Sequence, residues 1–280
     1  MQKTIDKQIT FEGIGLHSGV TVTVCLKPAE ANTRIVFERV DDVNGVIKAL
    51  YSNVVETRLG TTIANNEKII VSTIEHLMAA LWACDIDNVI IEINNQEVPI
   101  LDGSAINFVE QIEKVGVKEL EEKRKILKVL KPVVYEYKDT KIVLKPYDGF
   151  KINMEVEFPY GNISFQKDSF ELGKDSFKDA LGFARTFCNV QEIEMMRQMN
   201  LAKGGSLDNA AVYDQNGIVN ESGVRCENEV VKHKILDCIG DLFTSGYFMN
   251  CEVEAFKTGH TQNNEVLKNL FADEKNYVIE

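Results

Sequence analysis

The sequence predicts an α+β protein of two domains. The chain has 280 residues, about the length of two ordinary domains. Each half begins with short β-branched runs and ends in patterns of helical spacing. Between the halves lies a stretch dense in Glu and Lys, residues 118–131, followed by Pro132. We therefore expect two domains of similar topology, an N-terminal one over 1–122 and a C-terminal one over 126–280.

The first segments are typical of strands joined by tight turns. Residues 20–26 form an apolar, β-branched run that predicts a strand. The glycine cluster at 13–19 leads directly into this strand, whereas a dinucleotide-binding fingerprint leads into a helix. The pattern therefore excludes a Rossmann nucleotide site here.

Helical spacing first appears after Ser72. Four apolar residues recur at intervals of three or four: Ile74, Leu77, Met78 and Leu81. Further along, residues 89–93 predict a strand, and residues 102–104 begin a second helix that runs to about Val115.

The second half repeats the order of strands followed by helices. Residues 141–144 and 151–158 predict strands, and a long helix is expected from about Asn228 to Ser245. We interpret residues 118–131 as a charged helix end followed by a linker.

Composition and charge exclude several classes of protein. A net charge of −12 is unfavourable for nucleic-acid binding, which needs a basic face. No apolar stretch approaches the ~18 to 20 residues of a membrane-spanning helix, and the first residues lack the apolar core of a secretion signal. The six cysteines show no C-x-x-C spacing, which argues against a zinc ribbon or a redox pair. We therefore expect a cytoplasmic protein with reduced cysteines. We also expect it to act as a monomer.

Histidines are scarce, so a metal or acid–base site has few candidates. The four are His17, His76, His233 and His260. His233 and Asp237 are four apart and share one face of the long predicted helix, with Asp241 one turn further. The simpler interpretation is a helix-stabilising pair worth ~0.2–0.5 kcal/mol. However, the apolar residues around them predict a buried helix, and a buried row of three polar groups needs partners inside the protein.

Glu75 and His76 lie at the start of the first predicted helix. Ser72 and Glu75 have the S-x-x-E spacing of a capping box, which by itself could account for Glu75. His76 lies near the helix N-terminus, where a neutral imidazole is favoured over a cation. A neutral imidazole is the form that binds zinc.

Together, His76, His233 and Asp237 offer two nitrogens and one oxygen as ligands. Three protein ligands plus water are the pattern of catalytic zinc, whereas structural zinc uses four protein ligands. Adjacent helical residues point about 100° apart, so Glu75 is poorly placed as a further ligand. It can instead face the open position and act as general base in the hydrolysis of an amide or ester. Iron(II) also suits this ligand set.

His260 lies in a predicted loop before a final amphipathic helix. Taken alone, it is typical of a surface histidine. With Asp241 as a partner it could be held protonated, because a nearby carboxylate raises the pKa of an imidazole. A protonated imidazole can stabilise an oxyanion or protonate a leaving amine. We assign His17 a structural role.

Six segments occur in an order that one enzyme family shares. They are Phe11–Gly19, Ser72–Leu77, Val98–Ser104, Ala184–Phe187, Lys203–Asn209 and His233–Leu242. On these segments the chain resembles the UDP-3-O-acyl-N-acetylglucosamine deacetylase family over essentially its whole length. The resemblance implies a zinc enzyme of two domains, each layering helices against a mainly antiparallel sheet, with the active site between them. It also implies the reaction: release of acetate from UDP-3-O-(3-hydroxyacyl)-N-acetylglucosamine, the committed step of lipid A biosynthesis.

The resemblance implies the same metal site that the residue types suggest. His76, His233 and Asp237 would bind zinc, and Glu75 would be the general base. The chain departs from many relatives at Gly60, where they carry a cysteine near the metal.

Further catalytic and substrate positions are implied by the resemblance alone. His260 would be the general acid or oxyanion partner, oriented by Asp241. The Thr186 hydroxyl would stabilise the tetrahedral oxyanion, and Phe187 would pack on the sugar. Lys234 would reach toward the phosphates of the substrate.

The nucleotide and the acyl chain would occupy two other regions. Glu157 and Phe158 would be part of the nucleotide contact. An insertion at about 184–219 would line an apolar passage for the acyl chain.

Three other interpretations of the sequence stay open. A zinc hydrolase for a different amide or ester would use the same residues, and a substrate panel would separate it. A nucleotide-sugar binding module without chemistry would bind its ligand regardless of chelators or of Glu75→Ala. A plain α+β scaffold, in which the His–Asp pairs only stabilise helices, would hold no metal.

Overall fold

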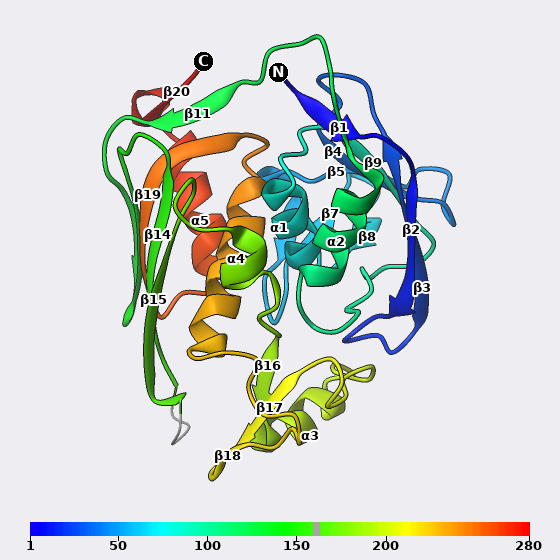
Figure 1. The fold of residues 1–280 in the computed structure, drawn as a ribbon, viewed down its shortest axis with the longest axis vertical. Helices are drawn as coiled ribbons and strands as arrows, with labels where there is room; N and C mark the ends of the chain where they lie inside the picture. Colours follow the sequence, from blue (N-terminus) through cyan, green and yellow to red (C-terminus); the bar gives the residue numbers. More distant parts are fainter. Residues whose placement is uncertain (159–162) are drawn as a thin grey trace.

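The computed structural model describes residues 1–158 and 163–280. Two large sheets form its outer layers, and helices lie between them (Figure 1). The main helices are α1 (Glu75–Ala83), α2 (Ile106–Val115), α4 (Glu229–Phe243) and α5 (His260–Phe271). Among the described residues, no helix has the length and apolar character needed to cross a bilayer.

The sheet of the first half, blue and cyan in Figure 1, has five strands in the order β2-β3-β9-β4-β5. Their bounds are β2 Ile9–Ile14, β3 Thr21–Pro28, β4 Ile35–Arg39, β5 Val46–Lys48 and β9 Val89–Ile93. Buried residues alternate along β3, as expected for a strand with one face on a core. Only β4 and β9 are parallel neighbours; the other pairs are antiparallel.

The second half repeats this sheet as β12-β13-β19-β14-β15. The strands are β12 Val133–Tyr137, β13 Thr140–Lys145, β14 Phe150–Glu157, β15 Phe165–Glu171 and β19 Phe248–Phe256. Again only one pair of these five, β14 with β19, is parallel. In both halves four strands are followed by a small three-stranded sheet, a helix, the central strand and a last helix. The α+β class and the similar topology of the halves are therefore confirmed.

Smaller elements complete each half. In the first, β1 (Lys3–Ile5) pairs with β10 (Val117–Glu119), and β6 (Val54–Glu56), β7 (Thr62–Ala64) and β8 (Ile70–Val71) form a sheet. In the second, β11 (Ile126–Val129) and β20 (Tyr277–Ile279) extend the large sheet from β19. Short helical turns are η1 (Tyr51–Asn53), η3 (Lys178–Gly182) and η4 (Glu274–Asn276).

The predicted insertion forms a separate small unit at the bottom of Figure 1. It consists of β16 (Phe187–Asn189), α3 (Val190–Gln198), β17 (Ala211–Asp214) and β18 (Gly217–Ile218). Its three strands pair only with one another within the described chain.

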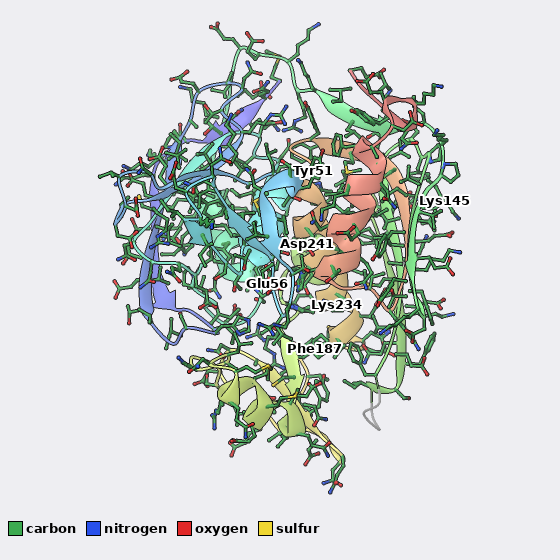
Figure 2. All side chains as sticks on the ribbon, turned by 180° about the vertical axis from the view of Figure 1, so that it is seen from behind. Tyr51, Glu56, Lys145, Phe187, Lys234 and Asp241 are labelled. Atoms are coloured by element: carbon green, nitrogen blue, oxygen red, sulfur yellow. The ribbon has the colours of Figure 1, made fainter. Side chains whose placement is uncertain are left out.

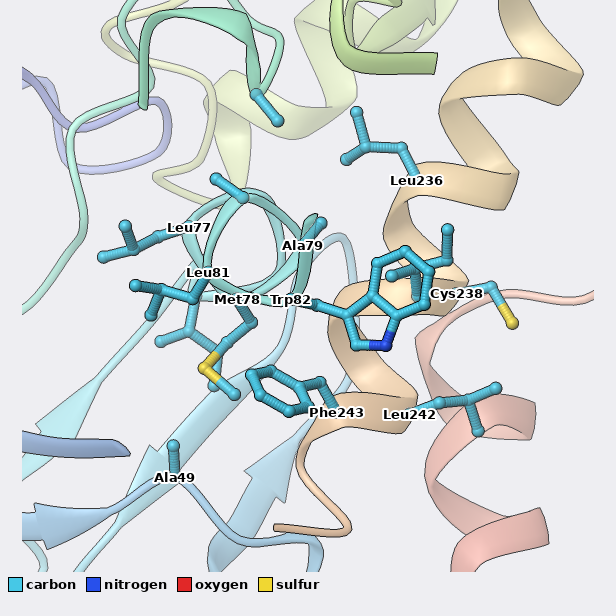
Figure 3. Close-up of a cluster of buried hydrophobic side chains, with 14 of the residues drawn as sticks. Ala49, Leu77, Met78, Ala79, Leu81, Trp82, Leu236, Cys238, Leu242 and Phe243 are labelled. Atoms are coloured by element: carbon cyan, nitrogen blue, oxygen red, sulfur yellow. The ribbon is translucent and has the colours of Figure 1, made fainter. Parts of the chain in front are cut away.

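Helices α1 and α4 pack directly against each other in the core (Figure 3). Apolar side chains from both, among them Trp82 of α1 and Phe243 of α4, fill the space around their contact. Burying a large apolar side chain stabilises a fold by about 1.5–3 kcal/mol. Gly240 permits the close approach, because a Cβ on it would lie 2.0 Å from the carbonyl oxygen of Glu75. The contact between α1 and α4 therefore places Glu75 beside the last turn of α4.

Residues 118–131 differ from their predicted structure. Helix α2 ends at Val115, and Gly116 follows with a φ of +87°, which glycine adopts without strain. The chain then enters β10 and, at Ile126, β11, so the segment is neither a helix end nor an unstructured linker. β10 is exposed along its length, so its charged side chains contact solvent.

All strand pairs among the described residues join strands of the same half. The domain boundaries at 122 and 126 stay a prediction.

Candidate functional site

The three predicted metal ligands come together between α1 and α4. His76 is the second residue of α1, and His233 and Asp237 lie one turn apart on α4. The Nε2 atoms of His76 and His233 lie 3.4 and 3.3 Å from Oδ1 of Asp237. One ligand atom from each residue lies within 4.8 Å of the others, and all three side chains are buried.

The surroundings of this cluster suit a cation. Oδ1 of Asp237 is buried and accepts no hydrogen bond from the part of the chain that the structure describes. The Nδ1–H of His233 donates to the Ala184 carbonyl at 3.0 Å, which leaves the Nε2 lone pair for the cluster. Burial lowers the pKa of His233 to about 4, so its imidazole is neutral near pH 7. A buried carboxylate oxygen beside a nitrogen lone pair is unfavourable unless a cation lies between them. The donor set therefore fits zinc.

Lys234 neutralises the other oxygen of Asp237. Its Nζ donates to Oδ2 of Asp237 at 2.8 Å. Burial alone would lower the pKa of Lys234, but the carboxylate of Asp237 raises it. Burial alone would raise the pKa of Asp237, but its interactions with His233 and Lys234 hold it well below its usual range. Asp237 is thus an anion with one oxygen left for a metal.

Glu75 adjoins His76 in the sequence but has a different partner. Its Oε2 accepts a hydrogen bond from the backbone N–H of Thr61 at 2.8 Å. Burial raises the pKa of Glu75, and such a shift is common in carboxylates that act as general bases. The oxygens of Glu75 and Asp241 and a ring nitrogen of His260 lie within 4.8 Å of one another, beside the metal cluster.

The alternative explanation of Glu75, a capping box with Ser72, is wrong. The Ser72 hydroxyl donates to the carbonyl of Gln96, and Ile74 occupies the N-cap position without a side-chain cap. Thr73 has a φ of +56°, and this turn directs Ser72 away from the helix end. Glu75 is therefore not explained by helix capping.

His260 is the first residue of α5, not part of a loop before it as predicted. Its Nδ1 lies 2.8 Å from Oδ2 of Asp241, and its Nε2 lies 4.0 Å from Oδ2 of Asp237. Asp241 also accepts hydrogen bonds from the Thr61 hydroxyl at 2.6 Å and from Asn263 Nδ2 at 2.8 Å. Burial alone would lower the pKa of His260, but Asp241 raises it to about 9. His260 is therefore protonated near pH 7.

A cavity of about 430 Å³ lies beside His233 and Lys234 and is also lined by Glu157, Phe158 and Phe187. The rings of Phe158 and Phe187 meet edge to face, with 5.1 Å between their centroids. Phe187 also lies 6.1 Å from the ring of His233. Figure 2 shows Lys234 on α4 and Phe187 where the chain enters the insertion. The structure thus brings all the predicted substrate residues to one cavity.

A second cavity, of about 340 Å³, lies within the insertion. Apolar residues on its wall include Ile193, Met196, Ala210, Val212 and Val219. Leu59, Thr186 and Phe187 line both this cavity and the larger one. The apolar cavity therefore meets the polar one next to the candidate metal cluster.

Thr186 is fixed at this junction through its backbone. Its N–H donates to the Gly103 carbonyl at 2.7 Å, and its carbonyl accepts from the Ala211 N–H at 2.8 Å. Gly103 has a φ of +85°, and a Cβ on it would lie 2.0 Å from the carbonyl oxygen of Asn209. Two segments singled out by the resemblance, 98–104 and 203–209, therefore meet here and hold Thr186 in place.

Arg185 ties the start of the insertion to the start of α4. Its Nε and Nη2 donate to the two carboxylate oxygens of Glu229 at 2.8 and 3.1 Å, and both side chains are buried. Burial alone would raise the pKa of Glu229, but the hydrogen bonds from Arg185 hold it below its usual range. The pair joins the backbone that carries Thr186 to the helix that carries His233.

Three residues near the site were not predicted to have a role in it. Lys257 lines the larger cavity, with its Nζ 2.6 Å from Oε2 of Glu157. The ring of His17 lies 3.0 Å from the Leu59 carbonyl and accepts from the Ala202 N–H at 3.4 Å, beside the apolar cavity. Thr61 contacts two carboxylates of the site. Lys257, a charge three residues before His260, and His17, one of only four histidines, left a signal in the sequence, whereas Thr61 left none.

Known proteins resemble this chain over nearly its whole length. The family model described as LpxC: UDP-3-O-acyl N-acetylglycosamine deacetylase matches residues 2–272. A UDP-3-O-acyl-N-acetylglucosamine deacetylase of Citrifermentans bemidjiense is 47% identical over 96% of this chain and 88% of its own length. Proteins of the same name from Geotalea uraniireducens and Shewanella frigidimarina are 45% and 42% identical. They align with 97% and 98% of this chain, and with 88% and 90% of their own lengths.

The family match and the relatives together define an enzyme of the deacetylase class. Within that class, the chain belongs to the UDP-3-O-acyl N-acetylglycosamine deacetylase family. The resemblance stated from the sequence is thereby confirmed. The metal and the roles of single residues stay predictions.

Proposed function

We propose that this enzyme hydrolyses the N-acetyl group of UDP-3-O-(3-hydroxyacyl)-N-acetylglucosamine in a zinc-dependent reaction that releases acetate. This reaction is the committed step of lipid A biosynthesis. The observation that carries the proposal is the buried cluster of His76, His233 and Asp237, in which Oδ1 of Asp237 has no donor among the described residues. Membership of the family supports the choice of substrate.

The metal would be held by two imidazole nitrogens and one carboxylate oxygen. His76, His233 and Asp237 supply these atoms, and the same set would also accept iron(II). When bound, the ion supplies Lewis acidity, which acidifies water and polarises a carbonyl oxygen.

Glu75 acts as the general base in this proposal. The Thr61 N–H holds its Oε2, which leaves Oε1 to accept a proton from the attacking water. The raised pKa brings the carboxylate closer to the working pH, where a base accepts a proton more readily. The water oxygen bonds to the acetyl carbon, and the carbon–nitrogen bond then breaks.

His260 and Thr186 act on the other side of the reacting carbonyl. Because Asp241 holds His260 protonated through Nδ1, Nε2–H can donate to the developing oxyanion or to the leaving amine nitrogen. The Thr186 hydroxyl, at the junction of the two cavities, adds a neutral donor for the oxyanion. The leaving amine takes up one proton, and the products are acetate and the free amino sugar.

The two cavities suit the two ends of an amphipathic substrate. Lys234 and Lys257 provide cations for the phosphates in a chain whose net charge is −12. Phe187 would pack on the sugar, and Glu157 and Phe158 would contact the nucleotide. The apolar cavity of the insertion would take the acyl chain.

We also propose that the enzyme acts in the cytoplasm as a monomer. All six cysteines are free thiols, which suits a reducing compartment. One chain supplies every ligand and proton-handling group of the site.

The test is acetate release from the acylated UDP-sugar by purified protein, with and without a chelator. We expect chelation to stop the release and added zinc to restore it. A substrate panel of other amides and esters should give much lower rates. If metal-loaded protein binds the UDP-sugar but releases no acetate, the binding module without chemistry becomes the better interpretation.

A further inference from the structure

Thr61 forms hydrogen bonds with two carboxylates of the site, Glu75 and Asp241, although it lines neither cavity. Its backbone N–H donates to Oε2 of Glu75 at 2.8 Å, and its hydroxyl donates to Oδ1 of Asp241 at 2.6 Å. Thr61 and both carboxylates are buried, each with at most 3% of its surface exposed. One residue therefore connects the first residue of α1 to the last turn of α4.

The backbone around Thr61 is held against the start of α1. The Thr61 carbonyl accepts from the N–H of Ile74, the residue before Glu75, at 3.3 Å. Gly60 has a φ of +156°, and a Cβ on it would lie 3.2 Å from Oε1 of Glu75. Gly60 thus leaves space around Oε1 of Glu75, while the N–H of Thr61 binds Oε2 of the same carboxylate.

The hydroxyl of Thr61 fixes the orientation of Asp241. Oδ2 of that carboxylate accepts from His260 and Asn263, and Oδ1 accepts from Thr61. Without the hydroxyl, a buried oxygen would lose its donor, which is unfavourable. The carboxylate could then rotate and weaken its hydrogen bond to His260.

We propose that Thr61 is a positioning residue for the deacetylation. Its backbone N–H holds Glu75, and its hydroxyl holds Asp241, which in turn binds His260. Thr61 thereby fixes the positions of the general base and of His260 relative to each other. The kinetic consequence rests on the proposed function. Because Thr61 does not line the cavities, its loss affects turnover and leaves substrate affinity unchanged.

The kinetic test compares Thr61→Val, which replaces the hydroxyl by a methyl group, with Thr61→Ser, which keeps it. We expect Thr61→Val to lower kcat about ten- to a hundredfold, as loss of a supporting hydrogen bond often does. KM and zinc content should not change, and Thr61→Ser should retain most of kcat. The control is Thr62→Val, the same change at a threonine whose hydroxyl bonds neither carboxylate among the described residues. A normal kcat in Thr61→Val would overturn the proposal.

A second measurement does not depend on turnover. The Nδ1–H of His260, observed by proton–nitrogen NMR of zinc-loaded protein at one pH, reports its hydrogen bond to Asp241. We expect this signal to shift in Thr61→Val and to stay in place in Thr61→Ser and Thr62→Val. An unchanged signal in Thr61→Val would refute the positioning role. If the unmodified enzyme releases no acetate, the proposed function fails, and the NMR signal still decides the role of Thr61. Thr61→Ala replaces the valine variant if that one does not fold.

Discussion

Two adjacent residues at the start of α1 have different surroundings, and these suit different tasks. His76 faces Asp237 and His233, whereas the carboxylate of Glu75 turns to Thr61 on the neighbouring loop. The ~100° between adjacent helical positions makes this separation possible. A ligand and a base can therefore be neighbours in the sequence without competing for the same metal position.

This difference predicts that metal binding and turnover can be lost separately. Glu75→Gln should keep the zinc and lose about 10²- to 10⁴-fold in kcat, because it removes only the general base. The measurement is kcat together with metal content by mass spectrometry. His233→Ala is the comparison, since it should lose metal and turnover together. A Glu75→Gln enzyme with near-normal turnover would contradict the base assignment.

The sequence predicted residues of the site where charge and rarity made them visible. With only four histidines in the chain, three of which meet acidic partners, the candidates were few. Thr61 was missed because a neutral side chain gives no signal until the fold brings residue 61 to residue 241. His17 was visible as one of the four histidines, but its place beside the site could not be predicted, because its ring contacts a residue 185 positions away.

At the scale of elements, the contact of α1 with α4 depends on one position without a side chain. Gly240 is next to Asp241, and its missing Cβ leaves space for the carbonyl oxygen of Glu75. Periodicity predicted both helices, but not that they touch or where. The spacing of apolar residues shows which face of a helix is buried and does not show against which partner.

Gly240→Ala should therefore separate the two helices. The added Cβ would lie 2.0 Å from a backbone atom, which cannot move like a flexible side chain. We expect a loss of about 1–3 kcal/mol or more in the free energy of unfolding, and a larger relative loss of turnover. Urea unfolding and kcat measure the two effects. The control is Gly182→Ala, because the nearest atoms to that new Cβ would lie at 3.5 Å, an ordinary contact.

The ion pair of Arg185 with Glu229 should make stability depend on pH. The folded pKa of Glu229 is depressed, so the contribution of the pair is fully present above the unfolded pKa and is lost as pH falls through the folded pKa. Glu229→Gln should cost about 3 kcal/mol or more near pH 7, because it leaves Arg185 buried without a charged partner.

Unfolding of this variant and of the unmodified enzyme, measured from neutral to acid pH, tests the idea. The difference in unfolding free energy should shrink as pH falls below about 4, the ordinary range of a glutamate. Glu265→Gln, which breaks the exposed ion pair with Lys268, should cost less than about 1 kcal/mol throughout. A difference for Glu229→Gln that is independent of pH would show that the pair contributes no charge-dependent stability.

At the scale of the whole molecule, the insertion places an apolar cavity beside a polar one. We expect kcat/KM to rise with the length of the acyl chain, by up to ~0.8 kcal/mol or about fourfold per buried CH₂. The measurement is a series of substrates of increasing chain length. Ala210→Phe, which fills the apolar cavity, should remove the preference for long chains and leave the zinc content unchanged. Equal rates on acylated and unacylated UDP-N-acetylglucosamine would contradict the assignment of this cavity.

The sequence predicted the order of strands and helices in each half better than it predicted the structure of single segments. Two rounds of strands followed by helices were visible in the sequence, and the structure shows the same strand order in both halves. The charged stretch at 118–131 was misread because exposed strands and exposed helices carry similar residues. Only the pairing of β10 with β1, more than a hundred residues away, distinguishes them.

The repeated topology has a consequence for how the enzyme loses activity on heating. Within the described chain, no strand pair crosses from one half to the other, so side-chain packing, loop hydrogen bonds and side-chain pairs such as Arg225 with Asp102 hold the halves together. The three proposed metal ligands come from both halves, because α1 supplies His76 and α4 supplies His233 and Asp237. A small separation of the two halves would move His76 away from His233 and Asp237 while both sheets stay intact. Thermal inactivation should therefore precede hydrogen exchange of the backbone amides in β9 and β19.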